Sequence, residues 1–142
     1  MIEIWNGTTD LRPLAEAWAK EVTDIADIEE GMRDLTCMKE GEYSDVFVLK
    51  HEDKVVGAMG IIVLDLFFSK EFHSAARYWY ILPKYRSLAR ELVNYAKKWS
   101  REKGCSKIML GSNERTPGND TIDKFYETIG FKKHETIYVG EL

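Results

Sequence analysis

A short basic turn between a predicted strand and a predicted helix carries the first chemical signal in this sequence. Within the turn, Arg86 can donate two parallel hydrogen bonds to a phosphate group, and Ser87 can cap the following helix. The amide groups at a helix start lack intrahelical partners, and the helix dipole favours an anion there. The stretch therefore indicates a phosphate site. The alternative is an ordinary turn whose basic side chains are solvated.

The elements that position this turn are readable from residue type and spacing. The aromatic and branched run 78–82 favours a strand, and Pro83 ends it because proline cannot donate to a ladder. One helical face then follows, made by Leu88, Leu92, Tyr95, Ala96 and Trp99. Gly104, preceded by four basic residues in the last turns, suits the end of that helix.

Length and composition indicate a single domain over residues 1–142. A net charge of −4 argues against a general nucleic-acid binder, so nucleic acid is not an expected partner. Cys37 and Cys105 lie far apart without a CxxC spacing, which predicts reduced thiols and no metal site. No leader pattern or apolar run of bilayer length is present, so we expect a cytoplasmic protein with no membrane partner.

The remaining chain alternates between strand and helix patterns. Thr8, Thr9 or Asp10 can cap a helix carrying Leu11, Leu14 and Val22, and His51–Lys54 reads as a hairpin turn. Further predicted elements are a strand over 2–5, a helix over 28–35, strands over 46–50 and 55–68, a loop over 67–73, a strand over 105–110, a helix over 120–129 and a last strand over 131–142. This order predicts an α/β fold, a mixed sheet with helices on both faces.

Three features together resemble the GCN5-related N-acetyltransferase (GNAT) superfamily, in its small phage and bacterial form. They are the strand–P-K-Y-R–helix unit, the Val-Val-Gly strand ending at Gly57, and Asn119 followed by Phe125–Phe131, similar to the signature N…FYEKLGF. The resemblance covers nearly the whole chain. It implies a GNAT-like central mixed, mostly antiparallel sheet flanked by helices on both faces.

The resemblance also implies the function and the site. An acetyl group would move from acetyl-CoA to an amine acceptor by direct attack, with Tyr126 as the general acid near the sulfur. The pyrophosphate would rest on the turn and helix start, and the pantetheine arm would pair with the central strand like an added strand. The implied cofactor-binding residues are Tyr80, Ile81, Leu82, Arg86, Ser87, Leu88, Ala89, Arg90 and Asn119.

The turn departs from the family pattern Q/R-x-x-G-x-G/A, because residues 86–91 contain no glycine. Counted forward from Arg86, the loop is about two residues short. Counted back from Leu92, Lys84 takes the first position of the pattern, with Ser87 and Ala89 at the glycine positions. The sequence leaves both registers open.

The general base and the acceptor stay open. The candidates for the base are Asp65, Glu71, His73 and Glu30, and an ordered water is a further alternative. The acidic stretch 24–30 hints at a cationic acceptor. The alternatives to an enzyme are a non-catalytic CoA-binding or protein-interaction module and a basic nucleic-acid patch. A homodimer is possible, since proteins that this chain resembles often dimerise.

Overall fold

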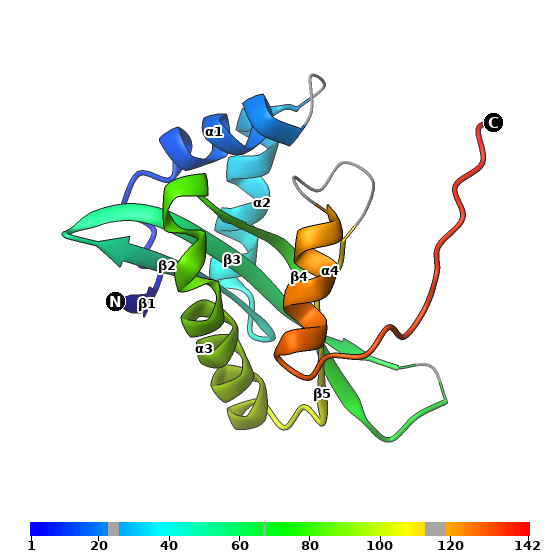
Figure 1. Ribbon diagram of the computed structural model, residues 1–142. Helices are drawn as coiled ribbons and strands as arrows, with labels where there is room; N and C mark the ends of the chain where they lie inside the picture. Colours follow the sequence, from blue (N-terminus) through cyan, green and yellow to red (C-terminus); the bar gives the residue numbers. More distant parts are fainter. Residues whose placement is uncertain (23–25, 67, 113–118) are drawn as a thin grey trace. The chain divides into compact units, whose positions relative to one another are not determined.

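The computed structural model describes residues 1–22, 26–66, 68–112 and 119–142, with only the backbone described at 119 and 120. The chain forms two compact units, residues 1–111 and residues 112–142 (Figure 1). The prediction of a single domain therefore stays a prediction.

A five-stranded sheet in the order β1-β2-β3-β4-β5 organises the first unit. Neighbouring strands are antiparallel, except that β4 and β5 run parallel. This arrangement confirms the predicted mixed, mostly antiparallel sheet. The strands are β1 Ile2–Ile4, β2 Ser44–His51, β3 Lys54–Asp65, β4 Phe72–Ile81 and β5 Lys107–Met109.

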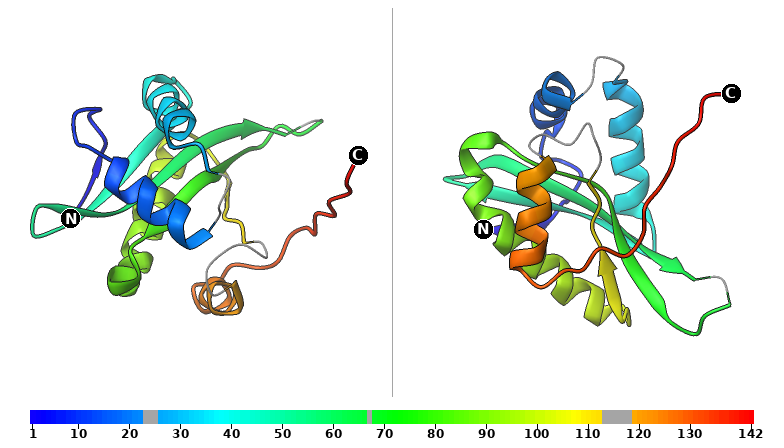
Figure 2. Two further views of the ribbon diagram at one scale, coloured as in Figure 1. Left: turned by 90° about the horizontal axis from the view of Figure 1, so that it is seen from above. Right: turned by 45° about the vertical axis from the view of Figure 1, so that its right-hand side comes forward.

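Three helices cover the two faces of this sheet, which is also as predicted. They are α1 Arg12–Val22, α2 Ile28–Glu40 and α3 Ala89–Glu102. Figure 2 shows α2 and α3 on opposite sides of the sheet. Alternation along β2 explains this arrangement, because Val46 and Val48 pack with residues of α2 while Phe47 points to the rings of α3.

Side-chain caps define where α1 and α2 begin. The Asp10 carboxylate accepts the Arg12 N–H at 2.9 Å, and the Asp27 carboxylate accepts the Glu30 N–H at 3.0 Å. Helix α2 runs five residues beyond the predicted end at residue 35, to Glu40. Gly31 does not end it, since packing of Leu35 and Met38 on the sheet outweighs the roughly 1 kcal/mol that glycine costs in a helix.

The hairpin turn predicted at His51–Lys54 is confirmed. Glu52 and Asp53 both have a positive φ, of 51° and 63°. Two consecutive left-handed residues make the type of turn that matches the twist of the flanking strands. The turn therefore fixes the antiparallel pairing of β2 with β3.

In the second unit, the predicted helix is confirmed as α4 Asn119–Thr128, and it ends before Gly130, whose φ is +87°. The predicted last strand over residues 131–142 is wrong, because this segment has no regular structure. Its apolar residues Ile137, Tyr138 and Val139 are exposed. A strand pattern alone does not make a strand, since the main-chain groups need a paired neighbour. The strand predicted from Cys105 is also shorter than expected.

We expect Gly57→Ala to destabilise the first unit. A Cβ atom there would lie 3.0 Å from Ile81 Cγ1 and 3.1 Å from the Tyr80 carbonyl oxygen. Because one of these neighbours is strand backbone, relief requires a backbone shift, and the expected cost is about 1–3 kcal/mol of unfolding free energy. Urea denaturation measures this loss.

Gly31→Ala is the matched control. A Cβ atom at this helical position would meet nothing within 4 Å, so alanine should stabilise the chain by about 0.5–1 kcal/mol. Equal stability of the Gly57 variant and the wild type would contradict the close approach at Gly57.

Candidate functional site

The second edge of β4 is paired along only part of its length. Strand β5 pairs with β4 at His73, Ser74 and Ala75. Beyond Ala75, β4 continues to Ile81 with β3 on one edge, and no strand of the described part of residues 1–111 pairs with its other edge. A ligand can pair with the main chain at the end of this stretch, at Ile81.

The register shows which main-chain groups face that open edge. The Leu82 N–H donates to the Val56 carbonyl at 2.9 Å, so this pair is hydrogen-bonded across the two strands. In an antiparallel ladder hydrogen-bonded and non-hydrogen-bonded pairs alternate. The next pair, Gly57 with Ile81, is therefore not hydrogen-bonded, and the N–H and C=O of Ile81 point away from β3. An extended ligand can pair with them as an added strand.

A β-bulge lies where β4 loses β5 as a neighbour. Gly60 lies opposite Tyr78 and Ile61 lies opposite Ala76, which leaves Arg77 as the extra residue. A bulge increases the local twist of the strand that carries it. The bulge therefore turns the last part of β4 away from the direction that β5 follows.

The turn after β4 is a 3₁₀ helix, Pro83–Leu88, that leads directly into α3. Within it the Tyr85 N–H donates to the Leu82 carbonyl at 2.8 Å, and the Ala89 N–H donates to the Arg86 carbonyl. The prediction that Ser87 caps the helix is wrong. Leu88 occupies the cap position, and no side chain caps the helix there. The first amide of the helix, that of Ala89, is instead bonded to the Arg86 carbonyl of the 3₁₀ turn.

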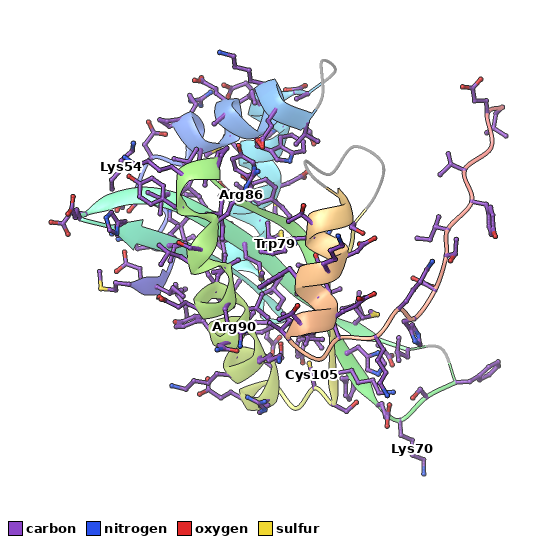
Figure 3. All side chains as sticks on the ribbon, in the orientation of Figure 1. Lys54, Lys70, Trp79, Arg86, Arg90 and Cys105 are labelled. Atoms are coloured by element: carbon purple, nitrogen blue, oxygen red, sulfur yellow. The ribbon has the colours of Figure 1, made fainter. Side chains whose placement is uncertain are left out.

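Arg86 lies at the end of the open edge and is tied to α1 (Figure 3). Its Nε donates to the Ile81 carbonyl at 3.2 Å, and its Nη2 pairs with the Glu21 carboxylate, at 2.9 Å from Oε2. Glu21 Oε2 also accepts the Tyr80 hydroxyl at 3.2 Å, and the guanidinium lies 5.7 Å from the centre of the Tyr80 ring. Arg86, Glu21 and Tyr80 thus join α1 to the end of β4.

Two tyrosines of β4 lie on the α1 face of the sheet. The rings of Tyr78 and Trp18 meet edge to face with centroids 5.9 Å apart. Burial raises the pKa of Tyr78, and burial together with the Glu21 charge raises the pKa of Tyr80. Both phenols therefore stay protonated at neutral pH. Trp79 points to the other face by strand alternation (Figure 3).

The structure places Tyr80, Ile81, Leu82 and Arg86 at the end of β4 and in the turn after it, and their assignment to the cofactor site stays a prediction. In this group, the Leu82 N–H is bonded to Val56, so Ile81 is the residue that presents its main chain to the open edge. Of the other predicted residues in the turn and helix start, Ser87 and Arg90 are exposed, Leu88 is half-buried and Ala89 is buried.

The two remaining predicted residues belong to the second unit. Nothing describes the Asn119 side chain, although its backbone begins α4. Tyr126 is buried on α4, with ring centroids 6.1 Å from Phe125 and 5.9 Å from Phe131. The assignment of both to the site stays a prediction.

Three of the residues considered as a general base lie at the end of the β3–β4 pair that is opposite to Ile81. Asp65 pairs with Phe72 at the end of β3, and Glu71 precedes β4. His73 is a buried strand residue and not a loop residue, with its Nε2 3.4 Å from Glu71 Oε2. At about 3.3 Å per residue, His73 is about 25 Å from Ile81 along β4. This separation favours a base other than these three.

The acidic stretch at the start of α2 is partly neutralised. Glu29 pairs with Arg12 of α1, and Glu30, the fourth residue considered as a base, pairs with Arg33. The negative charge that it presents to an acceptor is therefore smaller than the sequence suggests. Glu21 was not predicted, because nothing in its sequence position separates it from Glu16, the other acid of α1.

The part of the chain that the structure describes offers neither a metal cluster nor a membrane span. No group of three or more His, Cys, Asp or Glu side chains in this part of the chain is arranged to hold a metal ion. None of its helices has the length and apolar content that crossing a bilayer requires.

A sequence model of the acetyltransferase (GNAT) family matches residues 9–131, and the chain therefore belongs to this family. It is an acyltransferase, and acetyl-CoA is its donor substrate. No curated protein matches the chain significantly in sequence.

Solved structures with similar folds include acetyltransferases. The aminoglycoside acetyltransferase AAC(6')-Iy, in complex with a CoA-containing bisubstrate analogue, matches with a TM-score of 0.79 at 16% identity, covering 100% of this chain and 97% of that one. An acetyltransferase of Trypanosoma brucei matches with a TM-score of 0.74 at 22% identity, covering 100% and 99%. The aminoglycoside 6'-N-acetyltransferase AAC(6')-Ih of Acinetobacter baumannii matches with a TM-score of 0.76 at 9% identity, covering 100% and 97%. At these identities the likeness concerns the fold.

The raised pKa of Tyr78 predicts a loss of stability in alkali. An unfolded tyrosine ionises near pH ~10, whereas the folded chain holds the Tyr78 proton to higher pH, so above this pH the unfolded state binds fewer protons. Stability should therefore be fully present below about pH 10 and fall as the pH rises further. Tyr78→Phe should reduce that slope by up to about 1.4 kcal/mol per pH unit, measured by urea denaturation between about pH 8.5 and 11.5.

Tyr43→Phe is the control for this series, because Tyr43 is exposed in the folded chain. Its slope should match that of the wild type. Identical slopes for Tyr78→Phe and the wild type would contradict a half-buried Tyr78 that keeps its proton.

Proposed function

We propose that the protein transfers an acetyl group from acetyl-CoA to a primary amine by direct attack of the amine on the thioester. The observation that carries this proposal is the open edge of β4, where the Ile81 main chain lies beside the Arg86 guanidinium. The main chain can pair with the extended, amide-containing arm of CoA, and the guanidinium can pair with the anionic pyrophosphate joined to that arm.

The donor would lie along β4 and across the following turn. Its pantetheine arm donates a hydrogen bond to the Ile81 carbonyl, next to Tyr80 and Leu82, and the resemblance to the family assigns Asn119 to the same arm. Its pyrophosphate lies at Arg86 and the start of α3, near Ser87, Leu88, Ala89 and Arg90. Because the Ala89 amide already donates to the Arg86 carbonyl, the Arg86 guanidinium carries more of the phosphate binding in this proposal.

The chemistry needs an oxyanion donor and an acid. The amine lone pair forms a C–N bond at the thioester carbon, and the Ile81 N–H donates to the oxygen that becomes negative. Collapse of the tetrahedral intermediate breaks the C–S bond, and Tyr126 donates a proton to the departing thiolate. The proton of the attacking amine passes to solvent, and the Tyr126 phenolate takes a proton from solvent, which restores the acid. The products are an N-acetylamine and CoA.

Calorimetric titration with acetyl-CoA tests the donor site without knowledge of the acceptor. We expect micromolar binding by the wild type, and at least about tenfold weaker binding by Arg86→Ala because a charge-assisted pair with phosphate is lost.

Lys54→Ala removes a charge of the same sign from the β2–β3 turn, away from Arg86, and should bind like the wild type (Figure 3). Failure of the folded wild type to bind at millimolar acetyl-CoA would refute the proposed donor site.

Tyr126→Phe tests the proposed acid. We expect kcat to fall by about 100-fold or more with the affinity for CoA nearly unchanged, because proton donation to the thiolate is removed. Release of the CoA thiol during incubation with a panel of primary amines measures turnover.

Tyr138→Phe is the matched control, since this tyrosine is exposed in the tail. It should retain the wild-type rate. A Tyr126→Phe variant with undiminished turnover would remove Tyr126 from the mechanism.

A further inference from the structure

The Glu21 carboxylate holds the side chain that the donor is proposed to need. Arg86 has two of its nitrogens engaged, Nε on the Ile81 carbonyl and Nη2 on Glu21. Bidentate recognition of a phosphate requires two parallel N–H groups of one guanidinium. A pyrophosphate at this turn therefore meets an arginine whose charge is already paired.

We propose that Glu21 is a positioning residue that competes with the donor's pyrophosphate for Arg86, so that donor binding exchanges one anion for the other. This inference rests on the proposed function, because it takes the CoA pyrophosphate as the ligand of Arg86. In the unliganded chain Glu21 orients Arg86 at the end of the open edge. When the donor arrives, the doubly charged pyrophosphate replaces the singly charged carboxylate.

The exchange is local. Helix α1 is held on the sheet by Leu11 and Leu14, whose side chains are 1% and 4% exposed, and this packing does not involve Glu21. The Tyr80 hydroxyl, which donates to Glu21 at 3.2 Å, remains bonded to the carboxylate after Arg86 leaves. The helix therefore need not move for the guanidinium to change partner.

The Arg86–Glu21 ion pair adds little to the stability of the fold. A role of Glu21 in competition with the donor can therefore be tested separately from a structural role. The Arg86 and Glu21 side chains are 42% and 25% exposed, and ion pairs at such exposure contribute little to the free energy of unfolding. A glutamine at position 21 can still accept the Tyr80 hydroxyl while it loses the charge that holds Arg86. Glu21→Gln thus removes the competition and retains the contact between α1 and β4.

The test is calorimetric titration with CoA, which needs no acceptor and no turnover. We expect Glu21→Gln to bind CoA about three- to fivefold more tightly than the wild type, as the release of a partly exposed ion pair predicts. Glu16→Gln, an equal charge change at an exposed position of the same helix, should bind like the wild type. In the Arg86→Ala background, Glu21→Gln should have no effect, because no guanidinium is left to compete for.

Affinity and stability must be read together. A thermal midpoint close to that of the wild type, with tighter CoA binding, supports the exchange. Equal or weaker binding by a folded Glu21→Gln overturns it and assigns Glu21 a purely structural role. If the wild type binds CoA and Arg86→Ala weakens binding while Glu21→Gln changes nothing, this inference fails and the proposed donor site stands. If neither the wild type nor Glu21→Gln binds CoA, both fail.

Discussion

The requirement that every main-chain amide and carbonyl of a strand has a partner sets the position of the site. Strand β4 has a neighbouring strand on both edges near Ala75 but on only one edge near Ile81. The reason is that β5 is short and pairs only with the first residues of β4. A bulge at Arg77 turns the last part of β4 away from β5's direction. The unmet capacity at Ile81 is what an extended ligand can satisfy.

The basic turn keeps its place because α3 is anchored to the sheet at its other end. Trp99 donates its indole N–H to the Asp45 carboxylate of β2 at 2.9 Å, and the hydroxyls of Ser74 and Ser100 lie 2.6 Å apart in the interior. Hydrogen bonds of this kind between a helix and a sheet fix their relative orientation, since they form only when the two elements are correctly placed. The start of α3, and with it Arg86, is therefore held against β4.

The absence of glycine in residues 86–91 has a structural counterpart. The turn closes on itself as a 3₁₀ helix, and at least the Ala89 amide is bonded within it. A glycine loop would bring main-chain amides to a phosphate, whereas this turn presents the Arg86 side chain. A side chain can turn from one partner to another, as we propose for Arg86 when it leaves Glu21, whereas a main-chain amide inside the turn cannot move to do so. In the proposed site, the positive charge of the turn can therefore change its anionic partner.

The sequence by itself determined the elements with local causes. Proline at 83, the helical spacing up to Trp99 and the turn at 51–54 predicted the end of β4, α3 and the β2–β3 hairpin, because turn chemistry and periodicity act within a few residues. Strand β4 begins at Phe72, six residues before the strand predicted from residue 78. Tertiary structure alone decided that Ile81 faces the open edge, that Glu21 holds Arg86, that His73 is buried and that residues 131–142 form no strand. Each of these depends on strand register or on contacts between segments far apart in the chain, which local pattern does not encode.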